Sequence, residues 1–181
     1  MSLVSDASGA ATFDAVEAGI AALGGKKRMG TAFEHVVAHY LRHDPTVGFT
    51  DVWLWDDWPD RIRLRLKGDQ GIDIVAIDGE GIRVADQVKF HSDPDRDVSQ
   101  REVATLFSFR PDLFGRWVIV SNAIGHSRNA ERATAGRGDV TWVHRDALAD
   151  STIDWSGALE AVSGRAEPQI ERRIPREPDQ V

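Results

Sequence analysis

Three polar side chains stand at the ends of two apolar segments, where a β-sheet normally buries hydrocarbon. Asp73 lies at the start of one apolar run, and Gln87 and Lys89 lie near the end of the next. A carboxylate and an amide oxygen can bind a hard divalent cation, and a lysine can act on a water molecule or on developing negative charge. On two adjacent strands, these residue types would supply what metal-assisted hydrolysis of a phosphodiester needs.

The segment between the two runs, residues 78–81 (Asp-Gly-Glu-Gly), predicts a hairpin turn. Side chains alternate along a strand, and facing residues of a hairpin share a sheet face. The apolar rows are Ile72, Ile74 and Ala76 on the first strand and Ile82, Val84, Val88 and Phe90 on the second. If both rows face the core, Asp73 shares a face with Gln87 and Lys89, and Asp86 faces the other way. This pairing needs an odd-length loop or a bulge at the turn, and a shift by one residue would instead put Asp73 beside Asp86.

These residues resemble the PD-(D/E)xK nuclease superfamily, in particular its Mrr-like branch, in which glutamine replaces the second acid. Residues 26–155 also resemble the N-terminal nuclease domain of Type ISP restriction-modification enzymes and related DEAD/DEAH-box helicases. The sequence departs from that family at Asp86, where an apolar residue is usual, and at Val88, where cysteine is frequent. The segments that carry the resemblance are residues 30–34, 53–58, 68–73, 87–90 and 153–155.

The resemblance implies a restriction-endonuclease-like α/β fold, with three α/β/α layers around a central mixed sheet. It also implies a Mg²⁺-dependent deoxyribonuclease, able to use Mn²⁺, that cuts double-stranded DNA. In the family, helicase, methyltransferase and target-recognition domains belong to the same polypeptide, which is an ATP-dependent restriction-modification enzyme. The chain itself has no Walker-type phosphate loop, so we expect it to bind no nucleotide.

The family's site residues map onto the polar residues of the two strands. Asp73 and Gln87 would bind the metal, together with the backbone carbonyl of Val88, and Lys89 would serve the attacking water. Because Gln87 is neutral, it predicts weaker metal binding than glutamate would give. Glu34 would complete the metal shell through a bound water.

Glu34 also has a purely structural interpretation. Residues 31–34 (Thr-Ala-Phe-Glu) form a capping box for a helix predicted to start at Thr31, in which Glu34 would bond back to the Thr31 amide. On a helical wheel, however, Glu34 borders the apolar face beside Leu41, and from there it could reach the edge of the sheet. Both interpretations stay open at this point.

Four histidines could suggest other chemistry. His35, His39 and His43 follow helical spacing, but the glutamate precedes the first histidine instead of following it, as a zincin motif would require. A solvent-facing flank of the helix explains them better. His91 follows the second strand and could contact a phosphate, although an ordinary loop position is the simpler interpretation.

Six tryptophans are many for 181 residues. Trp53, Trp55 and Trp58 could stack on unpaired bases, but core packing is the more common role of such residues. We therefore predict that they belong to the core.

The composition indicates a globular, cytoplasmic protein. Hydrophobic residues make up 41% and charged residues 28% of the chain, and no cysteine is present to form disulfides or thiolate metal sites. No apolar run is long enough to span a membrane. The net charge of −7 argues against a pure DNA clamp, which would be basic.

The predicted elements alternate between helix and strand late in the chain, which also favours a layered α/β fold. We divide the chain into an N-terminal helix with a frayed terminus (1–25), a nuclease domain (26–160) and a charged, proline-containing linker toward a helicase domain (161–181). The predicted helices are 13–23, 31–43, 99–109, 126–135 and 146–149, and the predicted strands are 52–55, 61–66, 72–76, 82–90, 117–120 and 140–143.

Two alternatives to the restriction-modification nuclease remain. One is a stand-alone Mrr-like nuclease that acts on modified DNA. The other is a degenerate nuclease fold that only binds DNA or a partner, and the presence of both Asp73 and Lys89 argues against it.

Overall fold

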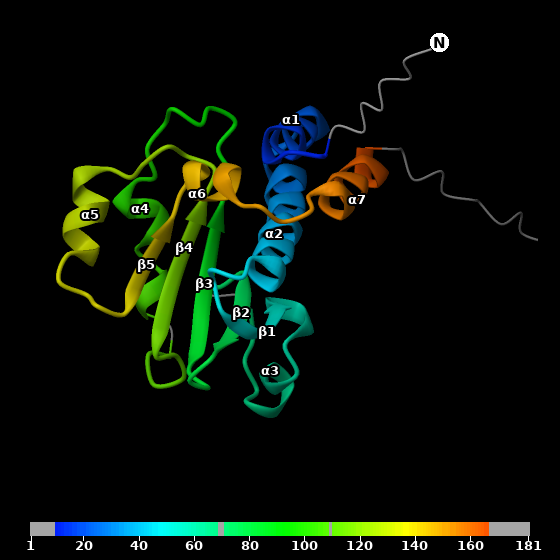
Figure 1. Cartoon of the computed structure of the whole chain (residues 1–181). Helices are drawn as coiled ribbons and strands as arrows, with labels where there is room; N and C mark the ends of the chain where they lie inside the picture. Colours follow the sequence, from blue (N-terminus) through cyan, green and yellow to red (C-terminus); the bar gives the residue numbers. More distant parts are fainter. Residues whose placement is uncertain (1–9, 69–70, 109, 167–181) are drawn as a thin grey trace, which may run out of the picture.

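The computed structural model describes residues 10–68, 71–108 and 110–166, and these build a five-stranded sheet with helices on both faces (Figure 1). The strand order is β1-β2-β3-β4-β5. Strands β1, β2 and β3 are antiparallel neighbours, and β4 and β5 continue the sheet in parallel with β3. The strands are β1 (Phe49–Leu54), β2 (Ile74–Asp78), β3 (Arg83–Lys89), β4 (Arg116–Ser121) and β5 (Val140–Val143).

The helices form the two outer layers, so the predicted three-layer fold with a mixed sheet is confirmed. One apolar core lies between the sheet and the helices α1, α2, α6 and α7, and a second core, rich in tryptophan, lies on the other face. Trp55 and Trp58 are buried in this second core, as predicted. The helices are α1 (Phe13–Leu23), α2 (Lys26–His43), α3 (Asp60–Arg63), α4 (Gln100–Val103), α5 (Arg128–Thr134), α6 (Arg145–Asp150) and α7 (Ser156–Ala166), with 3₁₀ turns η1 (Trp55–Asp57) and η2 (Leu106–Ser108).

The predicted register between the two central strands is confirmed. Ile74 pairs with Asp86 and Ala76 with Val84, and residues 78–82 form the expected odd-length loop. The carboxylate of Asp78 holds this loop, because its Oδ1 accepts hydrogen bonds from the amides of Glu80 and Ile82, both at 2.9 Å.

The first long helix begins earlier than predicted, at Lys26 instead of Thr31. Gly25, with φ of 78°, ends the turn after α1, and the chain enters α2 directly. The basic residues of the first turn argued against a helix start at Lys26, because cations are unfavourable near a helix N-terminus. Arg28 offsets part of that cost by donating from Nη1 to the carbonyl of Leu23 at 3.1 Å, at the C-terminal end of α1.

The prediction of a strand over residues 61–66 is wrong. The segment forms α3 and a turn in which Arg65 has φ of 53°, and Ile62 is 80% exposed. The alternation of arginine with apolar residues imitated a strand, whereas Pro59 and Asp60 favour a helix start.

The C-terminal helix α7 was not predicted, and it continues past the proposed boundary at residue 160. It packs against α1 and α2, and Val162 is buried in the same core as Phe13 and Trp155. The described residues between 13 and 166 therefore contribute to the same two cores, and the part of the predicted linker (161–181) that begins at residue 167 lies outside the described residues. Within the described ranges, no helix is both long and apolar enough to cross a bilayer.

Candidate active site beside strand β2

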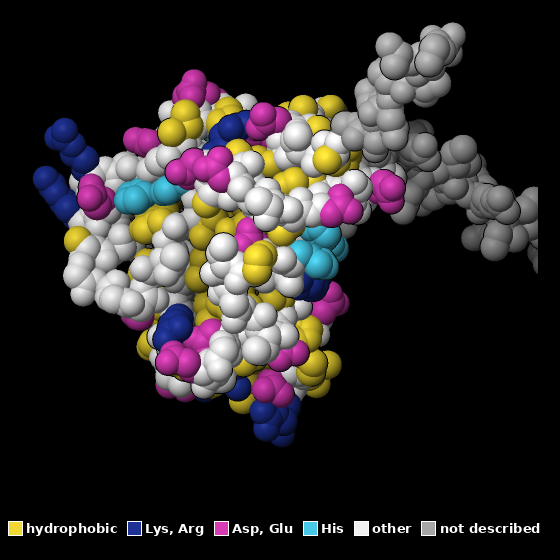
Figure 2. Space-filling view, viewed as in Figure 1, with side chains coloured by type: hydrophobic (Ala, Val, Ile, Leu, Met, Phe, Trp, Pro, Cys, Tyr) yellow, Lys and Arg dark blue, Asp and Glu magenta, His cyan; other side chains and the backbone are white. Residues whose placement is uncertain are grey.

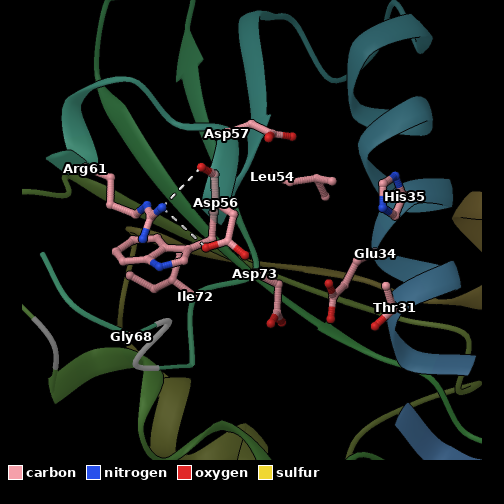
Figure 3. Close-up of a pocket in the computed structure, with 11 residues that line it drawn as sticks. Thr31, Glu34, His35, Leu54, Asp56, Asp57, Arg61, Gly68, Ile72 and Asp73 are labelled. Carbon is pink, nitrogen blue, oxygen red and sulfur yellow. Dashed lines mark hydrogen bonds and ion pairs between the residues drawn. The ribbon is translucent and has the colours of Figure 1, made fainter. Parts of the chain in front are cut away.

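A cavity of about 590 Å³ lies where the segment before β2 meets α2 and the end of β1 (Figure 3). Four carboxylates line it, together with one arginine, Arg61. This arginine is engaged with Asp56, since its Nη2 lies 3.6 Å from the carboxylate and 3.3 Å from the carbonyl of that residue. The lining residues are Thr31, Glu34, His35, Leu54, Trp55, Asp56, Asp57, Arg61, Gly68, Ile72 and Asp73.

Asp73 occupies the point where the ladder between β2 and β3 stops. Strand β2 begins only at Ile74, whereas β3 continues to Lys89, so the amide of Val88 has no backbone partner on β2. The Asp73 side chain fills this place, because Val88 N donates to Asp73 Oδ2 at 2.7 Å. The carbonyl of a strand residue points to the same side as its amide, so the Val88 carbonyl is expected on the Asp73 side of β3.

Glu34 projects from α2 into the same cavity, and in Figure 3 its carboxylate lies beside that of Asp73. The capping interpretation of Glu34 is excluded, because α2 starts at Lys26 and Thr31 lies inside the helix. The structure therefore brings two of the predicted site residues together from separate elements.

Gln87 and Lys89 do not line this cavity. Gln87 is only 1% exposed, and its Oε1 has no hydrogen-bond partner among the described residues. Its Nε2 lies against Gly71, where a Cβ would come within 3.1 Å of it. Lys89 is half-buried at the end of β3, opposite Ser121, and makes no ion pair or hydrogen bond with the part of the chain that the structure describes.

Asp86 corrects one sequence-based expectation. The carbonyl of Asp86 accepts a hydrogen bond from the Asp73 amide at 2.9 Å, so the two residues are adjacent. Burial raises the pKa of the Asp86 carboxyl well above its usual range, and the charge of Asp73 raises it further. The prediction that Asp86 lies away from Asp73 is therefore wrong. Asp73 precedes β2, and the alternation of side chains along that strand does not extend to it. Ile72 and Ile74 are two positions apart and would share a face within a strand, but they lie in different cores.

The available donors fit a hard divalent cation. All are oxygens, and the buried Oε1 of Gln87 and both carboxyl oxygens of Asp86 have no hydrogen-bond partner among the described residues. No three histidine or acidic side chains of the described ranges converge as a complete ligand set. Mg²⁺ does not require one, because it usually keeps several waters and takes one or two carboxylates.

The remaining histidines have structural partners. His91 is 7% exposed, with Nε2 at 3.0 Å from Glu102 Oε1 and Nδ1 at 3.0 Å from the carbonyl of Arg96. These contacts hold the loop after β3 against α4, whose predicted capping box between Ser99 and Glu102 is confirmed. His39 contacts the carbonyl of Asp154 at 2.9 Å, so it helps to join α2 to the segment before α7.

Comparison with known proteins points to one class of enzyme. Residues 42–164 match the model of an Mrr-type restriction endonuclease family. No curated protein sequence matches the chain.

Three solved structures share the fold. The ATP-dependent Type ISP restriction-modification enzyme LlaBIII bound to DNA is 24% identical with a TM-score of 0.62, over 94% of this chain and 10% of LlaBIII. MspJI restriction endonuclease in complex with a 27-mer oligonucleotide is 18% identical with a TM-score of 0.51, over 85% of this chain and 32% of MspJI. The DNA modification-dependent restriction endonuclease AspBHI is 17% identical with a TM-score of 0.50, over 86% of this chain and 36% of AspBHI.

Proposed function

Since the chain belongs to the Mrr-type restriction endonuclease family, we propose that it hydrolyses phosphodiester bonds of double-stranded DNA with a divalent cation, Mg²⁺ or Mn²⁺. The observation that carries the proposal is the position of Asp73. Its carboxylate stands at the open end of β3, in a cavity that it shares with Glu34. Asp73, Gln87 and the Val88 carbonyl would hold the cation, and Glu34 would support a bound water.

The cation, when bound, would lower the pKa of a coordinated water and offset the charge on the phosphate oxygens. The chain's own residues prepare for this. The hydrogen bond from the Val88 amide fixes the Asp73 carboxylate, so that little side-chain freedom is lost on binding. The buried carbonyl oxygen of Gln87 supplies an acceptor without adding charge.

Lys89 would orient the attacking water or stabilise charge on the phosphate in the transition state. Its ammonium group has no partner in the described part of the chain, so no internal ion pair has to break before it meets a phosphate. Residue 89 ends β3, two positions beyond Gln87, and therefore leaves the same face of the strand as Gln87.

The charge distribution suggests that other parts of a larger protein hold the DNA. The net charge is −7, and the cavity carries four carboxylates. Figure 2 shows lysine and arginine side chains dispersed among acidic ones on the face in view, without a continuous basic surface. The chain spans about a tenth of LlaBIII, and we propose that it likewise serves as the nuclease part of an ATP-dependent enzyme with helicase, methyltransferase and target-recognition domains.

The test is cleavage of supercoiled plasmid DNA by the purified chain, with Mg²⁺, Mn²⁺ or Ca²⁺. We expect weak nicking with Mg²⁺ or Mn²⁺ and none with Ca²⁺. Asp73→Ala and Lys89→Ala should abolish it without unfolding the domain, because neither side chain belongs to an apolar core. Lys27→Ala, an exposed change in the first turn of α2, is the matched control and should cut normally.

Two results would overturn the proposal. One is cleavage by Asp73→Ala at the wild-type rate. The other is a lack of cleavage both by this chain and by a longer polypeptide that contains it. Cleavage restricted to modified plasmid would favour the stand-alone alternative, and metal-independent DNA binding without cleavage would identify a degenerate nuclease fold.

A further inference from the structure

We propose that Asp86, whose side chain leaves the face of β3 opposite to that of Gln87, takes the place of Gln87 as the second side-chain ligand of the divalent cation, which it would bind together with Asp73. This inference rests on the proposed nuclease function and identifies a residue that the resemblance does not assign. It addresses an imbalance in the proposed ligand set, because Gln87 is neutral and leaves Asp73 as the only anion among the strand residues to which the resemblance assigns the metal.

The backbone puts the two carboxyl groups next to each other. Asp86 pairs with Ile74, the residue after Asp73, and accepts the Asp73 amide hydrogen bond at 2.9 Å. The Asp73 side chain then runs along β3 to the amide of Val88, at 2.7 Å. Asp86 and Val88 are two residues apart on one strand, so their side chains leave the same face of β3. The Asp73 carboxylate thus lies beside the strand edge between these two positions.

Nothing among the described residues satisfies the Asp86 carboxyl. The residue is 0% exposed, and neither of its carboxyl oxygens has a hydrogen-bond partner there. Buried polar groups without partners are rare in folded proteins, and a bound ion or water is one of the few explanations for them. Its neighbours in the same row, Val84 and Val88, are apolar, so a valine at position 86 would continue that row without a buried polar group.

An acid kept at such a position is better explained by a function than by stability. A cation bound between the Asp73 and Asp86 carboxylates would offset their mutual repulsion and give the unpartnered oxygens of Asp86 a partner. Asp73 lines the cavity, so the cation would enter from that side.

The experiment measures binding of Mn²⁺ alone by the full chain, by isothermal titration calorimetry and by electron paramagnetic resonance, without DNA. The variants are Asp86→Asn, which keeps the shape, and Asp86→Val, which continues the apolar row. Asp73→Asn tests the proposed site itself. We expect both Asp86 variants to lose at least about tenfold in Mn²⁺ affinity, and Asp86→Val to melt at the same or a higher temperature than wild type without metal.

The outcomes separate this inference from the function on which it rests. If wild type binds Mn²⁺ and Asp73→Asn does not, while both Asp86 variants bind normally, the metal site stands and the role of Asp86 is refuted. If Asp86→Asn and Asp86→Val melt lower with unchanged affinity, Asp86 is a structural acid and the inference is refuted. If neither wild type nor any variant binds Mn²⁺, both the inference and the proposed metal dependence fail. Circular dichroism of each variant confirms that it is folded.

Discussion

Gly71 is the position where a single methyl group should disturb both the fold and the site. It lies two residues before Asp73 and adopts φ of +83°, a conformation that side-chain-bearing residues rarely take. A Cβ on Gly71 would come 2.7 Å from Thr105 Oγ1 and 3.1 Å from Gln87 Nε2. Gly71→Ala therefore adds backbone strain and also pushes directly on a proposed metal ligand.

The size of the effect follows from these two contributions. Placing an L-residue in the left-handed region costs about 1–2 kcal/mol. Forcing extra atoms into a filled space typically costs about 1–3 kcal/mol more. Gly81 provides a matched control, because its φ is +79° and nothing lies within 4 Å of its Cβ position. Gly81→Ala should therefore lose about 1–2 kcal/mol, and Gly71→Ala about 2–5 kcal/mol.

The assay is urea denaturation of both variants at 25 °C, followed by circular dichroism and tryptophan fluorescence. A double-mutant cycle with Thr105→Ala isolates the steric part, since the nearest remaining Thr105 atom, Cβ, would lie 3.6 Å away. Equal losses for Gly71→Ala and Gly81→Ala would refute the steric argument. The steric argument would also be refuted if the losses in free energy of unfolding caused by Gly71→Ala and Thr105→Ala were strictly additive. Where Gly71→Ala remains folded, we also expect slower cleavage, because Gln87 must shift.

Two further perturbations test the helices beside the site. Glu34→Gln should reduce cleavage at least about tenfold while leaving the free energy of unfolding within about 0.5 kcal/mol, because Thr31 is not a helix cap; unchanged cleavage would remove Glu34 from the site. Burial raises the pKa of Glu102, but hydrogen bonds from Ser99 and the charge of His91 outweigh it and lower the pKa overall. The ionised Glu102 carboxylate therefore stabilises the folded state at pH values above the ordinary glutamate pKa, about 4.3. This stabilisation is lost as the pH falls through the lowered pKa. Glu102→Gln should flatten this acid limb of the unfolding free energy, and an unaltered limb would contradict the assignment.

Local patterns in the sequence predicted the parts of the sheet that local physics determines. The Asp-Gly-Glu-Gly turn and the apolar rows correctly predicted that the row of Ile74 and Ala76 faces the same core as Val84 and Val88, because only one register buries both rows. The capping box at Ser99 and the continuous apolar run of β4 were also predicted, since each depends on neighbouring residues alone. The family resemblance added what these patterns could not, namely which of the polar strand residues carry chemistry.

The errors arose where tertiary contacts override local patterns. Alternating arginine and apolar residues predicted a strand at 61–66, but the chain leaves the sheet at Trp55, whose ring is buried against Trp58. Helix α7 contains Gly157 and Gly164 and has a weak helical pattern, and packing against α1 stabilises it. At Gly19, a Cβ would approach Val162 Cγ1 to 3.2 Å, which shows how closely the two helices meet.

The most consequential error concerned where strand β2 begins. Alternation assigns a face to every residue inside a strand, but it cannot locate the first paired residue. Asp73 lies one position before that point, so its side chain can turn along the edge of β3 and bond the Val88 amide instead of pointing across the sheet. The unequal lengths of β2 and β3 thus create both the unpaired amide and the place for the carboxylate. A strand β2 extended by two residues would satisfy Val88 through its backbone and leave Asp73 without this anchor, so the early end of the ladder is itself part of the candidate site.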